Sequence, residues 1–441
     1  MDLFPSPSEY SDAGEGPASG RHNDNAASVD DEESAQRSRP RASYALMLEK
    51  ARDKAIRTVK GDYTPTDHDW AASLSLAPFA IFSMVSLFQA ANQECAAGIK
   101  VDTLDIMDLN GLVRRGKLPS QYFRTNVQHC GDVGREAYIQ AQHEMGAIHS
   151  MARALTDEKG SIANLVNFLE DPDDIRRNLK PEMDVIWASV SKCLGAAKAI
   201  VAKFHYWQLV ITHLKKDALT TKEKVTDEKR HRTQNQRDAE VESESALRSS
   251  ARKPTQHDSR LLSKSDLDLE RIRADIVALE NMMTILESSA HHLGVLKYHI
   301  ELLENVFKEM LELSIENTME TDVKAFLRLI HNSLDPDHAE SFRLSKQSKE
   351  TVIAAALRLQ GRFSVTVHIS GAYIEISNTH LQPAIGRMEW LKKDDFEAGC
   401  KRSVEQIGKL AAQVRRDFEG LAEDSIRAFV KRLIEATEEC G

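Results

Sequence analysis

Apolar residues follow a helical spacing over most of the chain, and two stretches form regular heptad seams. Pro181 is expected in the first turn of a helix. After it, apolar residues recur at alternating intervals of four and three from residue 186 to residue 214. The second seam runs from residue 272 to 313 with one three-residue slip, which corresponds to roughly 60 Å of helix. The predicted helix-interface residues are Ile186, Val190, Ile200, Phe204, Trp207 and Ile211, followed by Ile272, Ile276, Leu279, Leu286, Ile300, Leu303 and Phe307. We therefore expect an all-α fold, an elongated bundle of long antiparallel, coiled-coil-like helices.

One later stretch is ambiguous between helix and strand. "FSVTVHISGAYIEIS", from Phe363, is rich in β-branched residues, which are typical of strands. Its apolar residues also follow steps of four and three, and no second stretch of comparable quality could pair with it. We predict a helix here, followed by a last amphipathic helix around "VEQIGKLAAQVRRDFEGLAEDSIRAFVKRLIEA".

Shifts in composition divide the chain into four segments. Residues 1–42 are rich in Ser, Pro, Gly, Asp and Glu and predict a disordered acidic tail. Residues 43–214 predict a helical segment with an apolar helix at 71–93 and a heptad helix at 181–214. Residues 215–260 predict a polar linker or exposed hairpin, with Pro254 ending any helix that arrives from the N-terminal side. Residues 261–441 predict the long heptad helix and C-terminal helices that pack into the same bundle.

The run from Ala71 to Gln93 contains no charged residue and is long enough to span a membrane. However, a polar residue recurs at about every third position, Pro78 interrupts the run, and no Lys or Arg cluster flanks it. A core helix of a soluble bundle is therefore the favoured interpretation, and the alternatives are a permanent membrane span and a segment that is packed in solution but can be released to lipid. The candidate lipid-contact residues are Phe79, Ile81, Phe82, Val85 and Phe88.

Composition and charge narrow the environment. A formal net charge of -10 argues against nucleic acid or anionic lipid as a partner attracted by net charge. The five cysteines are far apart, odd in number and without a C-x-x-C pair, which favours free thiols in a reducing compartment. The N-terminus has neither a basic region nor an apolar region of a secretory signal. These features predict a cytoplasmic protein.

No arrangement of polar residues predicts catalysis. His143 and His149 in "HEMGAIH" are six residues apart, whereas two zinc ligands on one helix face are four apart. His129 and Cys130 are adjacent and cannot face each other, and Cys130 is expected to be a small core residue. His291, His292 and His299 fall on or beside the second seam, where interfacial histidines are expected in preference to metal ligands. The acidic residues of "EDPDDIRR" are expected to cap a helix start. We expect no enzyme activity, no cofactor and no metal site.

The order of these segments resembles a known group of proteins. The long seam from residue 269, followed by Tyr373, Ile376, Ser377 and Pro383 in a "Tyr-x-x-Ile-Ser … Pro" arrangement, resembles uncharacterised helical-bundle proteins of filamentous fungi. Those proteins distantly resemble α-helical pore-forming toxins of the cytolysin A and haemolysin BL type. The resemblance implies a rod of long antiparallel helices with an apolar element that can enter lipid. In this chain the polar residues 215–260 occupy the position of the usual apolar head.

These observations predict a non-enzymatic interaction or scaffold protein that binds itself or a protein partner through its heptad seams. A homo-oligomer or a protein partner is expected, nucleic acid is not, and a membrane is the less favoured partner. The alternative function is a membrane-active bundle, similar to a pore-forming toxin, that inserts helix 71–93 into lipid.

Overall fold

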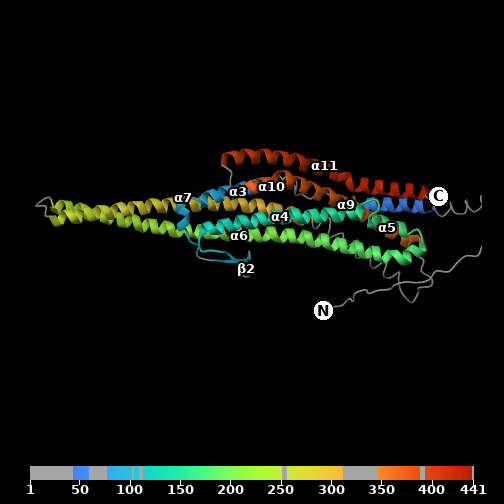
Figure 1. The fold of residues 1–441 in the computed structure, drawn as a ribbon, viewed down its shortest axis with the longest axis horizontal. Helices are drawn as coiled ribbons and strands as arrows, with labels where there is room; N and C mark the ends of the chain where they lie inside the picture. Colours follow the sequence, from blue (N-terminus) through green and yellow to red (C-terminus); the bar gives the residue numbers. More distant parts are fainter. Residues whose placement is uncertain are drawn as a thin grey trace, which may run out of the picture.

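The computed structural model describes residues 43–58, 77–101, 104–108, 113–250, 256–310, 346–387 and 393–439. Long helices lie side by side along one axis and form a rod (Figure 1). The longest are α4 (Phe123–Thr156), α6 (Pro172–Ser250), α7 (Gln256–Met310), α9 (Lys346–Ile376) and α11 (Lys393–Glu439). The expected all-α, elongated bundle is confirmed. The predicted tail, residues 1–42, lies outside the described residues.

The body of the rod is built from helices that reverse direction along the chain. α4 leads into the short α5 (Ser161–Phe168), α6 runs back along α4, and α7 returns beside α6 (Figure 1). A further helix, residues 43–58, lies beside α5, where the Tyr44 hydroxyl donates to the Val166 carbonyl oxygen at 2.6 Å. One continuous apolar core links all of these helices.

The start of α6 differs from the prediction. The helix begins at Pro172 and not at Pro181, which lies inside it. The Asp171 side chain accepts a hydrogen bond from the Asp173 backbone N–H at 2.8 Å, so the predicted cap at this acidic stretch is present. Pro181 lacks an N–H for the ladder, but the buried residues on both sides of it hold the helix together.

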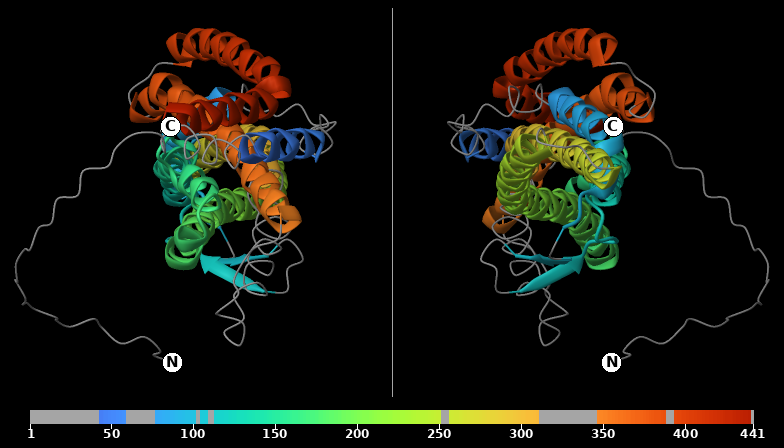
Figure 2. Two further views of the ribbon diagram at one scale, coloured as in Figure 1. Left: turned by 90° about the vertical axis from the view of Figure 1, so that its right-hand side faces the viewer. Right: turned by 90° about the vertical axis from the view of Figure 1, so that its left-hand side faces the viewer.

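The segment between the apolar helix and α4 is not wholly helical, contrary to the prediction for residues 43–214. A 3-10 turn, η1 (Glu94–Gly98), is followed by two short antiparallel strands, β1 (Asp105–Met107) and β2 (Arg114–Lys117). This hairpin projects from the side of the bundle (Figure 2). The sequence between the strands contains Asn110-Gly111, the commonest signal of a tight hairpin turn, and this signal could have predicted it.

The ambiguous stretch from Phe363 lies within α9 and is helical, as predicted. A π-helical turn, η5 (Ser377–Leu381), and α10 (Gln382–Arg387) follow it. α11 crosses α9 closely at Gly361, where a Cβ would meet the Ala422 carbonyl oxygen and the Ile426 side chain. The hydroxyls of Ser364 and Ser425, 2.6 Å apart, mark the same contact.

Other helices of the same chain cover most of the first seam and part of the second. The predicted interface residues that are buried are Ile186, Val190, Ile200, Phe204, Trp207, Ile211, Leu286 and Ile300. Three further residues of the second seam, Ile272, Ile276 and Leu279, are only half-buried. The side chains of Leu303 and Phe307 lie outside the described residues. The buried seam residues therefore stabilise the fold and offer no surface to a second molecule.

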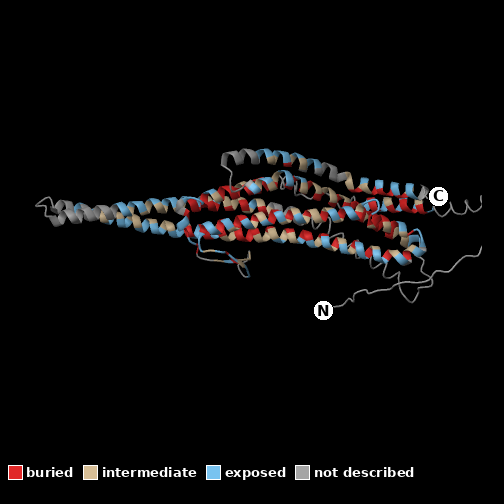
Figure 3. Ribbon diagram, viewed as in Figure 1, coloured by how far each residue is buried: buried red, intermediate tan, exposed pale blue. Residues whose placement is uncertain are grey.

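The distal parts of α6 and α7 extend beyond the other helices as a two-helix arm, defined as residues 222–250 and 256–284 (Figures 1 and 3). None of the arm residues whose side chains are described is buried. The residues that adjoin the arm on the bundle side, Thr221 of α6 and Ile285 of α7, are buried. At about 1.5 Å per residue, the arm is roughly 40 Å long. Of the predicted linker or exposed hairpin, residues 215–250 continue α6 and residues 256–260 begin α7, while residues 251–255 lie outside the described residues.

Candidate functional site

Two parts of the rod are candidates for binding: the apolar helix α3 (Ala77–Ala91) and the arm. α3 lies inside the bundle between α7, α4 and α11. Of the predicted helix 71–93, residues 71–76 lie outside the described residues, and at the other end α3 stops at Ala91, before Asn92 and Gln93. Pro78 does not interrupt α3, because it lies in the first turn, where its missing N–H removes no bond.

Most of α3 is buried, although it is too short to span a bilayer by itself. The buried members include Ile81 and Val85, each 1% exposed. The other candidate lipid-contact residues, Phe79, Phe82 and Phe88, are half-buried. All five therefore pack against protein, and contact with lipid would require α3 to leave the bundle.

Glycines on α4 make room for two aromatic rings. A Cβ on Gly131 would overlap the Phe88 ring of α3, and a Cβ on Gly134 would overlap the Trp207 ring of α6. At Gly146, farther along the same helix, a Cβ would meet nothing within 4 Å. Gly131 and Gly134 therefore form niches for α3 and α6. The sequence analysis did not predict these niches. The available signal was the spacing of the two glycines, which are three residues apart and so lie on one face of a helix.

An aromatic cluster joins α4 to α6 beside these niches. The Trp207 ring contacts Tyr138 at a centroid distance of 5.8 Å and Phe204 at 6.3 Å, and Tyr138 contacts Phe204 edge-on at 5.6 Å. The Tyr138 hydroxyl donates to the Ala77 carbonyl oxygen at 3.3 Å, at the start of α3. This cluster connects the docking of α3 to the packing of α4 on α6.

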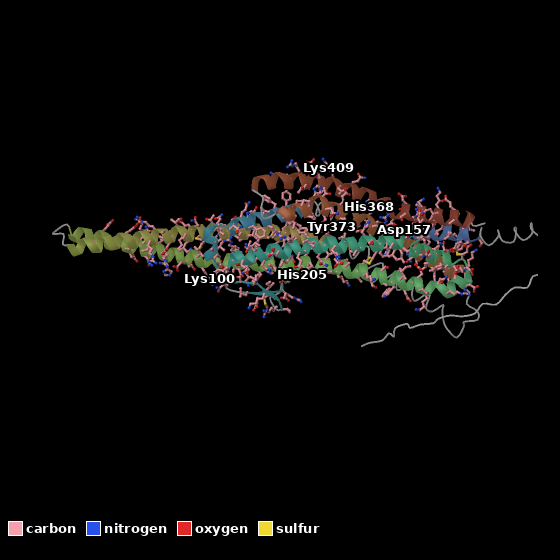
Figure 4. All side chains as sticks on the ribbon, viewed as in Figure 1. Lys100, Asp157, His205, His368, Tyr373 and Lys409 are labelled. Carbon is pink, nitrogen blue, oxygen red and sulfur yellow. The ribbon has the colours of Figure 1, made fainter. Side chains whose placement is uncertain are left out.

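Burial shifts the pKa of several groups near α3. The α7 residue His299 lies against the Phe79 ring, with centroids 6.0 Å apart, and burial lowers its pKa. Burial also raises the pKa of the Tyr138 hydroxyl, with a smaller contribution from Tyr373, which lies on α9 (Figure 4). A neutral His299 suits the apolar surface of α3, because a charge there would be poorly solvated.

The two described thiols, Cys130 and Cys193, are unsuited to nucleophilic chemistry. Burial raises the pKa of the Cys130 thiol to about 12, although a contact with Trp207 opposes the shift, and burial raises the pKa of Cys193 to about 12 as well. A thiolate is the reactive form of cysteine, and at neutral pH almost none exists at either position. Cys130 therefore acts as a core residue beside the aromatic cluster.

His143 and His149, the pair considered as metal ligands, have separate surroundings. The His143 side chain is 78% exposed and lies 3.8 Å from Glu144, whereas His149 Nδ1 lies 3.0 Å from the Val367 carbonyl oxygen and 3.2 Å from Ser370 Oγ on α9. Within the described ranges, no group of three or more His, Cys, Asp and Glu side chains could hold a metal ion. His149 connects α4 to α9.

The arm is held together by charged as well as apolar contacts. Along it, α7 contributes the half-buried Ile272, Ile276 and Leu279, and α6 contributes the half-buried Val225, Thr226, Thr233 and Gln236. Among the described side chains, three ion pairs join the helices within the arm, Lys229–Glu280 (2.8 Å), Arg232–Asp275 (3.6 Å) and Arg273–Glu240 (3.1 Å), and Lys222–Glu287 (3.0 Å) joins them at its base. Hydrogen bonds from Gln236 and Arg273 lower the pKa of Glu240. The arm thus keeps apolar side chains at least partly accessible on both helices, including Val241 on α6 and Val277 on α7.

Among the described helices, one segment is long and apolar enough to cross a membrane by length and composition. It is residues 177–241 of α6, whose most apolar window has a mean hydropathy of 1.5. In the bundle this helix carries Trp207 and the buried residues of the first seam, so its apolar face packs on protein. Its length and composition are therefore also those of a core helix.

Comparison with solved structures found the soluble AhlC triple head mutant of the tripartite α-pore-forming toxin AHL from Aeromonas hydrophila. The sequences are 11% identical, the alignment covers 66% of this chain and 98% of that one, and the TM-score is 0.37. No protein-family model and no curated protein matches the chain. The matched protein is of the class named in the sequence analysis, the α-helical pore-forming toxins, and the fungal source stays a prediction.

Proposed function

We propose that the protein is a non-enzymatic interaction protein of the cytoplasm, which uses the arm to associate with other helices, first of all those of its own copies. The observation that carries this proposal is the arm itself. It extends roughly 40 Å beyond the bundle, and none of its described side chains is buried. The described heptad residues inside the bundle are already covered, so among the described seam residues it is those of the second seam in the arm, Ile272, Ile276 and Leu279, that can accept another helix.

Shortening the arm tests this function. Because the Lys229 and Glu280 side chains are paired at 2.8 Å, residues 230–279 can be replaced by a short Gly-Ser turn that joins the two helices at this level. The change removes no described buried residue, so the thermal midpoint is expected to shift by only a few degrees. Sedimentation velocity of the full chain is expected to show concentration-dependent association, and the shortened protein should sediment as a monomer. Equal association of the two proteins would contradict the proposal.

A second candidate function, membrane activity, is supported by the absence of charge on α3. No acidic or basic residue occurs between Ala77 and Ala91, and its Phe88 ring occupies a niche that exists only because Gly131 lacks a side chain. Apolar contacts of this kind can be exchanged for contacts with lipid at little cost in free energy. In this function, α3 would leave the bundle at a membrane surface.

Gly131→Ala is the variant that weakens the docking of α3 without adding charge. The added methyl displaces the Phe88 ring, which costs about 1–3 kcal/mol of packing. If α3 enters lipid, flotation with neutral liposomes is expected to increase for Gly131→Ala relative to wild type. Gly146→Ala, on the same helix but without a neighbour within 4 Å, is the matched control and should float like wild type. If none of the three proteins floats, α3 is a core helix and the second function is excluded.

A further inference from the structure

Two parts of α11 differ in how firmly they pack on the bundle. We call residues 401–413 the strap and residues 420–433 the anchor. The anchor carries five buried apolar residues: Ala422, Ile426, Phe429, Val430 and Leu433. In the strap, Ile407 is the only buried residue among those whose side chains are described. The strap therefore buries much less apolar surface than the anchor and gains less free energy from packing.

The anchor lies on α9. A Cβ on Gly361 would meet the Ala422 carbonyl oxygen at 3.2 Å, and the hydroxyls of Ser364 and Ser425 are 2.6 Å apart in the same contact. α11 runs back along α9 in the opposite direction (Figure 1). The strap, which precedes the anchor in the chain, therefore lies level with the end of α9 and with the elements η5 and α10 that follow it.

The apolar helix α3 lies at the level of the strap. Gln142 of α4 is hydrogen-bonded to η5, and Tyr138, one turn earlier on α4, donates to the Ala77 carbonyl oxygen at the start of α3. From there α3 runs away from the anchor, to the niche that holds Phe88. The anchor contact at Ser364 is roughly 20 Å of helix away from η5. Because α11 contacts α3, this contact is made by the part of α11 that precedes the anchor.

The other long helices around α3 belong to a common core. α4 is fixed to α6 by the aromatic cluster around Trp207. α7 packs along α6 and contributes the buried Leu286 and Ile300 to the same core. Neither helix can leave α3 without opening this core. Of the long helices in contact with α3, α11 is the one that can move away while α4, α6 and α7 stay packed.

We infer that the strap is a detachable cover of α3, which lifts from the bundle while the anchor stays in place. Local opening of this kind occurs where a segment has few buried apolar contacts. Glycine is a weak helix former, and Gly420, where the anchor begins, is the point at which α11 bends when the strap lifts. This inference rests on the second candidate function, in which α3 leaves the bundle, and it names the segment that moves first.

Hydrogen exchange of the full-length protein, followed by mass spectrometry, tests the order of opening. In wild type, the strap is expected to exchange at least as fast as α3, and both faster than residues 352–376 of α9. Ile407→Ala is expected to speed exchange in the strap and in α3 about 30-fold or more, the factor for truncating a buried isoleucine. Ile426→Ala removes the same atoms from the anchor and is the matched control, because both side chains are fully buried. It should leave both rates unchanged.

Gly420→Ala tests the bend with an effect in the opposite direction. The described atom that a Cβ there would meet is Asp424 Oδ2, at 3.4 Å, which is an ordinary contact. The change therefore favours a continuous helix without displacing this neighbour, and exchange in the strap and in α3 is expected to slow by up to about fivefold. Gly146→Ala on α4, where a Cβ meets nothing within 4 Å, should leave both rates unchanged.

Three results would overturn the inference. The first is a wild-type protein in which α3 exchanges faster than the strap, which would show that α3 opens beneath a closed strap. The second is equal acceleration of the strap by Ile407→Ala and Ile426→Ala, which would show that α11 opens as one unit. The third is an unchanged rate in Gly420→Ala. Circular dichroism checks that each variant is folded, and the wild-type order and Gly420→Ala decide the matter if Ile407→Ala is not.

Flotation of the same variants with neutral liposomes separates this inference from the function on which it rests. If the strap opens as expected but neither Ile407→Ala nor Gly131→Ala floats, the strap is a cover and the membrane function fails. If Gly131→Ala floats while exchange of α3 does not depend on Ile407, the membrane function stands and the inference about the strap is wrong.

Discussion

Trp207→Ala is expected to lower the free energy of unfolding by about 3–5 kcal/mol, the range for removing a large, fully buried aromatic side chain. Trp207 is 1% exposed and touches Tyr138 and Phe204, so the cavity would open where α4 packs on α6. Urea unfolding followed by circular dichroism measures the change without relying on tryptophan fluorescence. Trp207→Phe, which keeps an aromatic ring, should cost less and remain folded.

A double-mutant cycle with Gly134 shows whether the niche is the reason for this cost. With Trp207 present, Gly134→Ala is expected to destabilise by about 1–3 kcal/mol, because the methyl overlaps the indole ring. With Ala at position 207 the overlap disappears, and the same change should be neutral or stabilise by up to ~1 kcal/mol through helix propensity. Gly146→Ala should have the same small effect in both backgrounds. Additive costs for positions 134 and 207 would show that the niche is not formed.

Val85→Lys is expected to destabilise the bundle by about 4–5 kcal/mol at pH 7. Val85 is 1% exposed, in a helix without any charged residue, so the new amine must lose its proton or α3 must leave its site. Deprotonating a lysine with an ordinary pKa of ~10.4 at pH 7 costs ~1.36 kcal/mol for each of roughly three and a half pH units. Hydrogen exchange should then show loss of protection in α3 and in the faces of α4 and α7 that cover it.

The pH dependence identifies the cause of this loss. Burial depresses the pKa of the lysine in the folded state, so the unfolded state binds more protons and stability rises with pH. The difference in stability between Val85→Lys and wild type should therefore shrink by ~1.4 kcal/mol per pH unit from pH 7 to pH 9. Gln89→Lys, at an exposed position of the same helix, is the matched control and should change stability little at any pH. A difference that does not vary with pH would indicate a steric effect instead.

The heptad spacing was sufficient to predict the long helices, because alternating steps of four and three place one apolar face along α6 and α7. The spacing did not reveal which element covers that face. Trp207 and Ile211 are covered within the chain, whereas Ile272 and Ile276 have the same spacing and stay half-exposed. The difference arises from helices far away in the sequence, and periodicity along one helix carries no information about them.

The start of α6, the two strands and the glycine niches were not predicted correctly, because the local sequence at each of them does not determine one structure. Proline is common in the first turn of a helix, which predicted a start at Pro181, but Pro172 meets the same condition and has the Asp171 cap in addition. The strands β1 and β2 are too short for alternation to be recognised. The niches at Gly131 and Gly134 depend on where the Phe88 and Trp207 rings arrive, which only the packed structure shows.

α6 is one uninterrupted helix of 79 residues, which passes through the aromatic cluster and continues to the end of the arm. No loop separates the two regions. The same helix carries Trp207, whose ring contacts Tyr138, and the Tyr138 hydroxyl donates to the Ala77 carbonyl oxygen in the first turn of α3. The arm and the site that holds the apolar helix are therefore joined by one unbroken backbone and two side-chain contacts.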